Sequence, residues 1–134
     1  MMQRIRKILI VDDNPDDIEL TKIVLEENGW DIQVVSCPSA EKALSCLREP
    51  GDLPCSILLD LNIPGMGGIE CLRQIRADES LKAIPVIMVT ASAFEQDQKK
   101  AYDAGANFFL YKELDIDSYS QKMHIALKGI LSEL

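Results

Sequence analysis

Five short runs of apolar residues alternate along the chain with segments of helical periodicity. The apolar runs span 7–11, 31–36, 55–60, 84–90 and 107–112. Helical patterns span 15–28, 38–48, 94–104 and 118–131, with a further one around Ile69 to Arg76. The apolar runs show little alternation with polar residues, which predicts strands covered on both faces, and hence a parallel sheet between two helical layers. With right-handed crossovers the predicted fold is (βα)₅, a doubly wound α/β domain.

The length of 134 residues suits one domain, and we find no linker, repeat or low-complexity segment. About twenty residues follow the fifth predicted strand. We therefore expect a single domain over 1–134, with no output domain. The net charge of −8 argues against nucleic acid or anionic membrane as a partner. The apolar runs are too short for a membrane span or a signal peptide, so we expect a cytoplasmic protein.

The four cysteines do not predict a metal site. Cys37, Cys46, Cys55 and Cys71 contain no C-x-x-C pair, and the single His124 completes no zinc cluster with them in a usual spacing. We expect reduced thiols in the core or at its boundary.

Polar residues stand where four of the predicted strands end. These are Asp12, Asp13, Asp60, Thr90 and Lys112. Each has an ordinary explanation by itself; the Asp12–Asp13 pair, for example, would suit the start of a helix. Together they indicate a site, because ligands of open parallel sheets bind beyond the carboxyl ends of the strands. Three clustered carboxylates would raise at least one pKa unless a cation lies among them, and hard oxygen ligands suit Mg²⁺.

This combination resembles the receiver domain of two-component response regulators, over essentially the whole chain. Asp12–Asp13 match the acidic pair of that family, Asp60 the phosphoacceptor and Lys112 the lysine. The remaining matches are Thr90–Ala91, for the switch hydroxyl and its small neighbour, and Asn62, Pro64 and Gly68, for the turn after the phosphoacceptor. The resemblance implies a flavodoxin-like three-layer sandwich with strand order 2-1-3-4-5.

The resemblance also implies a chemistry. Asp60 would accept a phosphoryl group from a phosphohistidine on a sensor histidine kinase or a phosphotransfer protein. Mg²⁺ (or Mn²⁺) would be held by Asp13, Asp60 and the backbone carbonyl of Asn62, with Asp12 acting mainly through water. Lys112, Thr90 and the amide N–H of Ala91 would stabilise the phosphoryl group. The chain would then catalyse only its own phosphorylation and dephosphorylation, and would not be an enzyme in the usual sense.

Switching is implied in the same way. Movement of Thr90 toward the phosphoryl group would vacate space, and Phe109, which matches the switch aromatic of the family, would turn inward. Phe108 should face the opposite side of the sheet. The face made by the fourth helix, fifth strand and fifth helix would carry the change to a downstream protein, or to a second copy in a homodimer.

Two departures from the family pattern bear on these expectations. Lys112 is followed by Glu113, where the family usually has proline after a cis peptide. A cis bond to a residue other than proline costs roughly 2.5–4 kcal/mol, so either strain is tolerated or the loop is reshaped. The expected lack of an output domain removes transcription from the direct roles. The stretches DDNPDD and DLNIPGMGG most resemble stand-alone regulators of phytochrome-type histidine kinases.

Three other functions make different demands on these residues. A phosphohydrolase of the haloacid-dehalogenase type needs Asp-x-Asp after the first strand, whereas Asp12 and Asp13 are adjacent. A flavodoxin-like cofactor binder needs a Ser/Thr/Gly-rich phosphate loop, and the acids of DDNPDD would repel a phosphate. A degenerate receiver that serves only as an interaction module stays open at this point.

Overall fold

Five parallel strands form one sheet in the order β2-β1-β3-β4-β5. The strands are β1 (Arg6–Val11), β2 (Ile32–Cys37), β3 (Ser56–Asp60), β4 (Val86–Thr90) and β5 (Phe108–Tyr111). The computed structural model describes residues 6–27, 29, 31–91, 94–112 and 115–131. The predicted parallel sheet and its strand order are confirmed.

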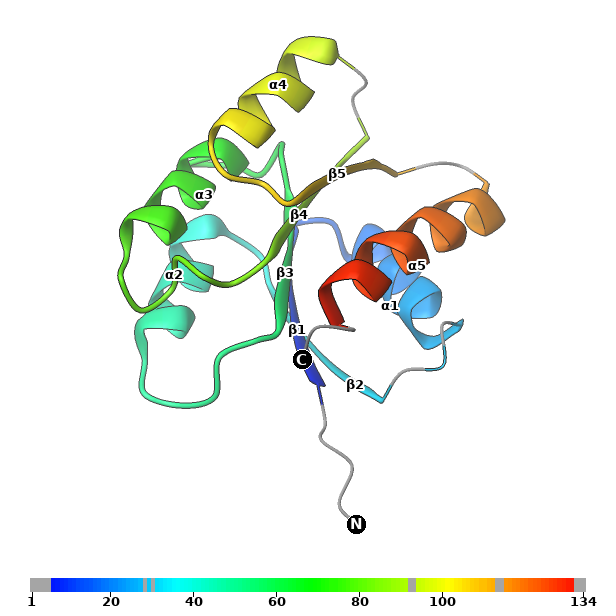
Figure 1. The fold of residues 1–134 in the computed structure, drawn as a ribbon, viewed down its shortest axis with the longest axis horizontal. Helices are drawn as coiled ribbons and strands as arrows, with labels where there is room; N and C mark the ends of the chain where they lie inside the picture. Colours follow the sequence, from blue (N-terminus) through cyan, green and yellow to red (C-terminus); the bar gives the residue numbers. More distant parts are fainter. Residues whose placement is uncertain (1–5, 28, 30, 92–93, 113–114, 132–134) are drawn as a thin grey trace.

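Helices cover both faces of this sheet. They are α1 (Pro15–Glu27), α2 (Ala40–Arg48), α3 (Gly68–Ala77), α4 (Glu95–Asp103) and α5 (Ile116–Leu131). Figure 1 shows α1 and α5 on one side of the sheet, with α2, α3 and α4 on the other. The predicted three-layer sandwich is therefore confirmed.

The predicted boundaries differ from the observed ones by up to two residues at an end. The run 84–90 begins as a strand only at Val86, since Pro85 has no N–H to give to a ladder. The last helix begins at Ile116, two residues earlier than predicted. The second helix begins at Ala40, because Ser39 caps it by accepting a hydrogen bond from the N–H of Lys42.

The core lies on both faces of the central strands, where every residue of β3 and β4 is buried. Leu9, Leu59 and Met88 belong to the apolar cluster under α2 and α3, whereas Ile8, Leu58 and Ile87 belong to the cluster under α1 and α5. This two-sided burial explains why the strands lack apolar–polar alternation. In the first helix Val24 and Leu25 are buried, whereas Ile23 is 46% exposed.

Arg76 of α3 braces the entry to β4 and β5. Its guanidinium donates to the carbonyl of Ile84 at 2.7 Å, to that of Gly105 at 2.9 Å and to Oδ1 of Asn107 at 2.9 Å. Asn107 Oδ1 also accepts from the N–H of Val86. These contacts hold the starts of the two strands whose other ends carry Thr90 and Lys112.

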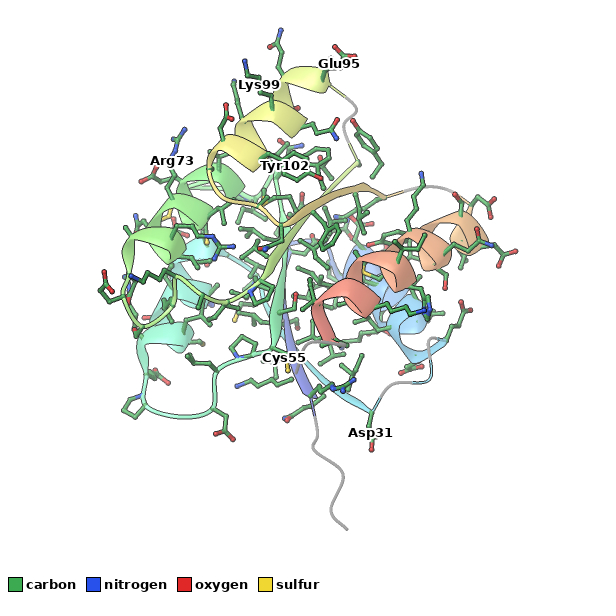
Figure 2. The ribbon with its side chains drawn as sticks, in the orientation of Figure 1. Asp31, Cys55, Arg73, Glu95, Lys99 and Tyr102 are labelled. Atoms are coloured by element: carbon green, nitrogen blue, oxygen red, sulfur yellow. The ribbon has the colours of Figure 1, made fainter. Side chains whose placement is uncertain are left out.

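No helix within the described ranges is long and apolar enough to cross a membrane. Figure 2 shows Glu95 and Lys99 of α4 pointing away from the sheet, and Asp31 at the opposite end of the molecule.

Candidate functional site

The polar residues predicted at the strand ends meet at one edge of the sheet. Asp60 and Thr90 end the adjacent strands β3 and β4, and Lys112 directly follows β5. The ladder continues to Lys112, because its N–H donates to the carbonyl of Thr90 at 2.8 Å. The N–H of Asp12 donates likewise to the carbonyl of Cys37, the last residue of β2, at 3.0 Å. These side chains share one edge because the strands are parallel and their carboxyl ends lie next to one another.

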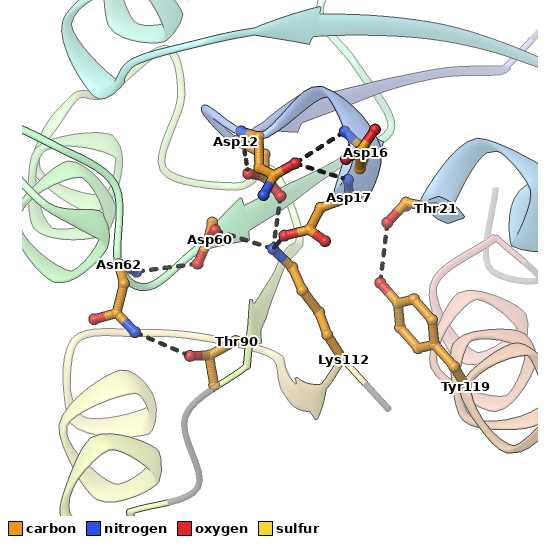
Figure 3. A network of polar contacts seen from close by, with 10 residues as sticks. Asp12, Asp16, Asp17, Thr21, Asp60, Asn62, Thr90, Lys112 and Tyr119 are labelled. Atoms are coloured by element: carbon orange, nitrogen blue, oxygen red, sulfur yellow. Dashed lines mark hydrogen bonds and ion pairs between the residues drawn. The ribbon is translucent and has the colours of Figure 1, made fainter. Parts of the chain in front are cut away.

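The ammonium group of Lys112 lies at the centre of this edge (Figure 3). Its Nζ atom is 2.7 Å from Oδ2 of Asp12, 3.0 Å from Oδ2 of Asp60 and 3.0 Å from Oδ2 of Asp17. The Lys112 side chain is only 7% exposed, and those of Asp12 and Asp60 are 4% and 11% exposed. A buried cation thus joins the ends of β1, β3 and β5.

Asp17 is a member of this site that the sequence reasoning missed. It lies in the first turn of α1, where acids were interpreted only as favourable helix-start residues. The side chain of Asn14 accepts hydrogen bonds from the N–H groups of Asp16 and Asp17, which fixes the start of α1 after Asp12. The cap and Pro15 mark in the sequence where α1 begins, but they do not report which way its first turn faces, so the contact of Asp17 with Lys112 carried no sequence signal.

Burial and charge act against each other on the titrating groups of the site. Burial is the largest effect on Asp60 and raises its pKa above the ordinary value, and the charge of Asp12 adds to the rise. The N–H of Asn62 and the ammonium of Lys112 oppose the rise. For Lys112 burial works to lower the pKa, but hydrogen bonds to Asp12 and Asp17 and the charge of Asp60 outweigh it, so its pKa is raised.

Three carboxylates at this edge are close enough to share a metal ion. One carboxylate oxygen from each of Asp12, Asp13 and Asp60 lies within 4.8 Å of the others. Asp12 and Asp60 are buried and Asp13 is exposed, so the group opens to solvent on one side. Hard, anionic oxygen donors with room for water fit a divalent cation such as Mg²⁺ or Mn²⁺. The expected contribution of the Asn62 carbonyl stays a prediction.

Asn62 connects the acid of β3 to the hydroxyl of β4. Its N–H donates to Oδ1 of Asp60 at 3.0 Å, and its side-chain Nδ2 donates to Oγ1 of Thr90 at 3.3 Å. Thr90 is fully buried. The family resemblance implied a role for the backbone carbonyl of Asn62, and the contact of its side chain with Thr90 is a second role.

Gly68 allows the loop after Asp60 to fold back tightly. Its N–H donates to the carbonyl of Leu61 at 3.0 Å. A Cβ atom there would lie 2.4 Å from the carbonyl oxygen of Asp60 and 2.8 Å from Cα of Leu61. Both of these atoms belong to the backbone and cannot rotate away from an added Cβ atom. The site therefore requires glycine at position 68.

The predicted switch aromatic is already inside the protein. Phe109 is 8% exposed and packs edge-on against Tyr111, with the ring centroids 5.4 Å apart. Tyr111 is the neighbour of Thr90 across the β4–β5 ladder. The expectation that Phe109 turns inward requires a ring that starts outside, and the described structure has it buried. Phe108 packs in the opposite cluster, as predicted.

One expectation concerns a residue beyond those described. The Lys112–Glu113 peptide includes Glu113, which lies outside the described residues. Ala91, whose N–H was expected to meet the phosphoryl group, is exposed at the end of β4. Among the described residues, the predicted thiols are free, with Cys37 and Cys71 buried, Cys55 half-buried and Cys46 exposed.

Comparisons with known proteins agree with this geometry. The model of the response regulator receiver domain family matches residues 8–124. The chain is 34% identical over 122 residues to the DNA-binding dual master transcriptional regulator RpaA of Synechocystis, covering 91% of this chain and 49% of that protein. It thus spans about half the length of the transcriptional regulators among the curated relatives it matches.

Solved structures with similar folds include two response regulators of closely matching size. The phosphorylated cyanobacterial phytochrome response regulator RcpA is 32% identical with a TM-score of 0.86, covering 98% of this chain and 97% of that one. The Mn²⁺-bound form of response regulator Rcp1 is 30% identical with a TM-score of 0.80, covering 94% of each chain. The carboxylates of Asp12, Asp13 and Asp60 gather beside Lys112 at the end of the sheet that we call the acidic edge. Because the family match extends over most of the chain, this protein belongs to the response regulator receiver domain family.

Proposed function

We propose that this receiver is a phosphoacceptor switch, in which Asp60 takes a phosphoryl group from the phosphohistidine of a histidine kinase or phosphotransfer protein. The observation that carries the proposal is the buried contact of Lys112 Nζ with Asp60 Oδ2 at 3.0 Å, beside the carboxylates of Asp12 and Asp13. This arrangement presents a carboxylate nucleophile next to a fixed cation.

In the proposed step an oxygen of Asp60 attacks phosphorus. The bond from phosphorus to the histidine nitrogen breaks, an acyl phosphate forms on Asp60, and the released imidazole takes up a proton. Asp12, Asp13 and Asp60, with the carbonyl of Asn62, would hold Mg²⁺ or Mn²⁺, which would offset the negative charge of the two reacting groups. Lys112 supplies a further positive charge at hydrogen-bond distance from Asp60.

The existing hydrogen bonds define what must move. Lys112 turns from the carboxylates of Asp12 and Asp17 toward a phosphoryl oxygen. Thr90 exchanges the Nδ2 group of Asn62 for a second phosphoryl oxygen, which the N–H of Ala91 also meets. Because Thr90 is fully buried, its movement changes the packing beneath it.

The change is proposed to reach the surface through β5. Tyr111 neighbours Thr90 across the ladder and packs against Phe109, so these two rings are the switch aromatics. β5 is an edge strand, and the flanking segments expose Phe94, Tyr102, Ile116 and Ile125. An unpaired strand edge beside exposed apolar side chains suits a protein partner, either a downstream protein or a second copy.

The likeness to RcpA supports a phytochrome-type histidine kinase as the phosphoryl donor. Phosphotransfer profiling against all histidine kinases of the source organism tests this directly, with preferential transfer from a kinase of that type expected. Sedimentation with and without beryllofluoride and Mg²⁺ tests the homodimer, which we expect beryllofluoride to favour. We also propose that the chain turns over no external substrate, so a small phosphate ester should not be hydrolysed.

The central test is phosphorylation by acetyl phosphate in the presence of Mg²⁺. Intact-mass spectrometry should show one added phosphoryl group on the wild-type protein and none on Asp60→Asn. Asp31→Asn is the matched control, because Asp31 is exposed at the far end of the sheet. Label that persists in Asp60→Asn, or is independent of Mg²⁺, contradicts the proposal.

A further inference from the structure

Two cysteine sulfurs lie close together between β2 and α2. Sγ of Cys37 is 4.0 Å from Sγ of Cys46. Cys37 is the last residue of β2, and Cys46 lies on α2, the helix that follows directly. A disulfide requires an S–S separation of about 2.05 Å, so the two sulfurs must approach by roughly 2 Å to form a bond.

The two thiols differ in accessibility. Cys46 is exposed and lines a cavity of about 240 Å³ together with Lys7, Pro50 and Leu53. Cys37 is 5% exposed and faces the apolar cluster under α2. Burial raises the pKa of the Cys37 thiol to about 11, so at neutral pH it stays protonated. An oxidant in solution therefore meets Cys46 first, and Cys37 is placed to react second.

We propose that Cys37 and Cys46 form a reversible intramolecular disulfide when the protein meets a peroxide, with Cys46 as the attacked thiol and Cys37 as the resolving thiol. The Cys46 thiol releases its proton, and the thiolate attacks one oxygen of hydrogen peroxide. An S–O bond forms and the O–O bond breaks, which gives a sulfenic acid, and the departing hydroxide takes up the released proton to leave as one water. The sulfur of Cys37 then attacks the sulfenic sulfur. The S–S bond forms, the S–O bond breaks, and the departing hydroxide takes the Cys37 proton to leave as a second water. The two sulfurs are oxidised together by two electrons, and the peroxide is reduced.

A disulfide between Cys37 and Cys46 would also affect the acidic edge, because both of its segments are hydrogen-bonded to residues near that edge. The carbonyl of Cys37 accepts the N–H of Asp12 at 3.0 Å. On α2, Oε1 of Glu41 accepts the N–H of Met66, in the loop after Asp60, at 3.1 Å. A bond between Cys37 and Cys46 therefore restrains two segments that contact the edge from different sides. This consequence concerns structure and does not depend on the proposed function.

The test exposes the full chain to hydrogen peroxide and maps its peptides by mass spectrometry. The wild-type protein should lose two hydrogens and give a Cys37–Cys46 cross-linked peptide, which dithiothreitol reverses. Cys46→Ser should abolish the cross-link without disturbing the core, because Cys46 is exposed. Cys55→Ser is the matched control and should retain it. Amide NMR spectra of the oxidised wild type should show shifts at Asp12 and Met66 that oxidised Cys46→Ser lacks.

Other outcomes overturn the proposal. Oxidation that stops at Cys46 as sulfinic acid, or that joins two chains through Cys46, shows that Cys37 does not resolve it. If the cross-link forms but the amide signals of Asp12 and Met66 do not shift, the disulfide does not affect the acidic edge, and that part of the proposal is wrong. Because none of these measurements uses phosphorylation, their failure is distinguishable from failure of the phosphoacceptor proposal.

Discussion

The ammonium of Lys112 lies 2.7 Å from the carboxylate of Asp12, although 100 residues separate them in the chain. The pair is buried, and it is extended by Asp17 and Asp60 into a cluster with one cation and three anions. Because the carboxylates outnumber the single buried ammonium, the stability of the cluster depends on that cation, which makes its members sensitive to substitution.

Replacing Lys112 with methionine should destabilise the protein. The change leaves Asp12 and Asp60 buried without their cation, and we expect a loss of about 3–5 kcal/mol in the free energy of unfolding at pH 7 without Mg²⁺. Added Mg²⁺ should recover more stability in the variant than in the wild type, because it can take over the missing charge. Urea denaturation with and without Mg²⁺ measures both effects.

Lys82→Met is the matched control for this substitution. Lys82 pairs with Glu79 at 2.7 Å, but both side chains are more than half exposed. Its removal should therefore change stability by less than about 0.5 kcal/mol. If Lys112→Met costs no more than Lys82→Met, the buried cluster is not a stabilising feature.

Asp17→Asn should speed phosphorylation by acetyl phosphate. The carboxylate of Asp17 lies 3.0 Å from the ammonium of Lys112, and its side chain is 34% exposed. An ion pair this exposed restrains Lys112 by about 0.2–1 kcal/mol. Without it, the rate of phosphorylation should rise by up to about fivefold. Rates are measured by intact mass at fixed Mg²⁺. Asp16→Asn is the control, since it removes the same charge one residue earlier at an exposed position. An equal rise in both variants would point to net charge in place of the Lys112 contact.

Gly68→Ala should damage the loop after Asp60. A methyl group cannot be placed 2.4 Å from the carbonyl oxygen of Asp60, so the loop must shift, at a cost of about 1–3 kcal/mol. Mg²⁺ affinity, measured by calorimetry, should fall with it. Gly129→Ala on α5 is the control; its nearest contact would be an ordinary 3.6 Å, so it should stabilise the helix by about 0.5–1 kcal/mol. A Gly68→Ala variant as stable as the wild type would refute the steric account.

Cys71 should make stability depend on pH in the alkaline range. It is fully buried on α3, and burial raises its pKa from 9.0 to about 11. Below about pH 9 the thiol is protonated in both states and its contribution is complete. Between about pH 9 and 11 the unfolded chain loses the proton first, so stability falls as the pH rises, by up to about 2–3 kcal/mol.

Denaturation under reducing conditions across this range measures the effect. Cys71→Ala should lose stability less steeply than the wild type over the same interval. Cys55→Ala, a half-buried thiol just before β3, serves as the comparison and should keep most of the wild-type slope. Identical slopes in Cys71→Ala and the wild type would contradict the prediction.

The sequence by itself determined the layers and the edge at which polar residues gather. The uniformly apolar run ending at Asp60 is buried on both faces of the sheet, and this pattern predicts a central parallel strand without any tertiary information. Since parallel strands end on the same side, Asp60, Thr90 and Lys112 were also predicted to share an edge. The strand order, by contrast, followed from the family resemblance.

The tertiary structure decided which side chains meet at that edge. Asp17 contacts Lys112 because α1 leaves the sheet with its first turn facing Asp12, and the periodicity of a helix does not report that direction. The side chain of Asn62 reaches Thr90 through a loop shape that depends on close packing at Gly68. Phe109 is buried because the covering helices enclose its face of the sheet. Hydrophobic patterns are local properties of the chain, whereas these contacts join segments whose relative positions arise only on folding.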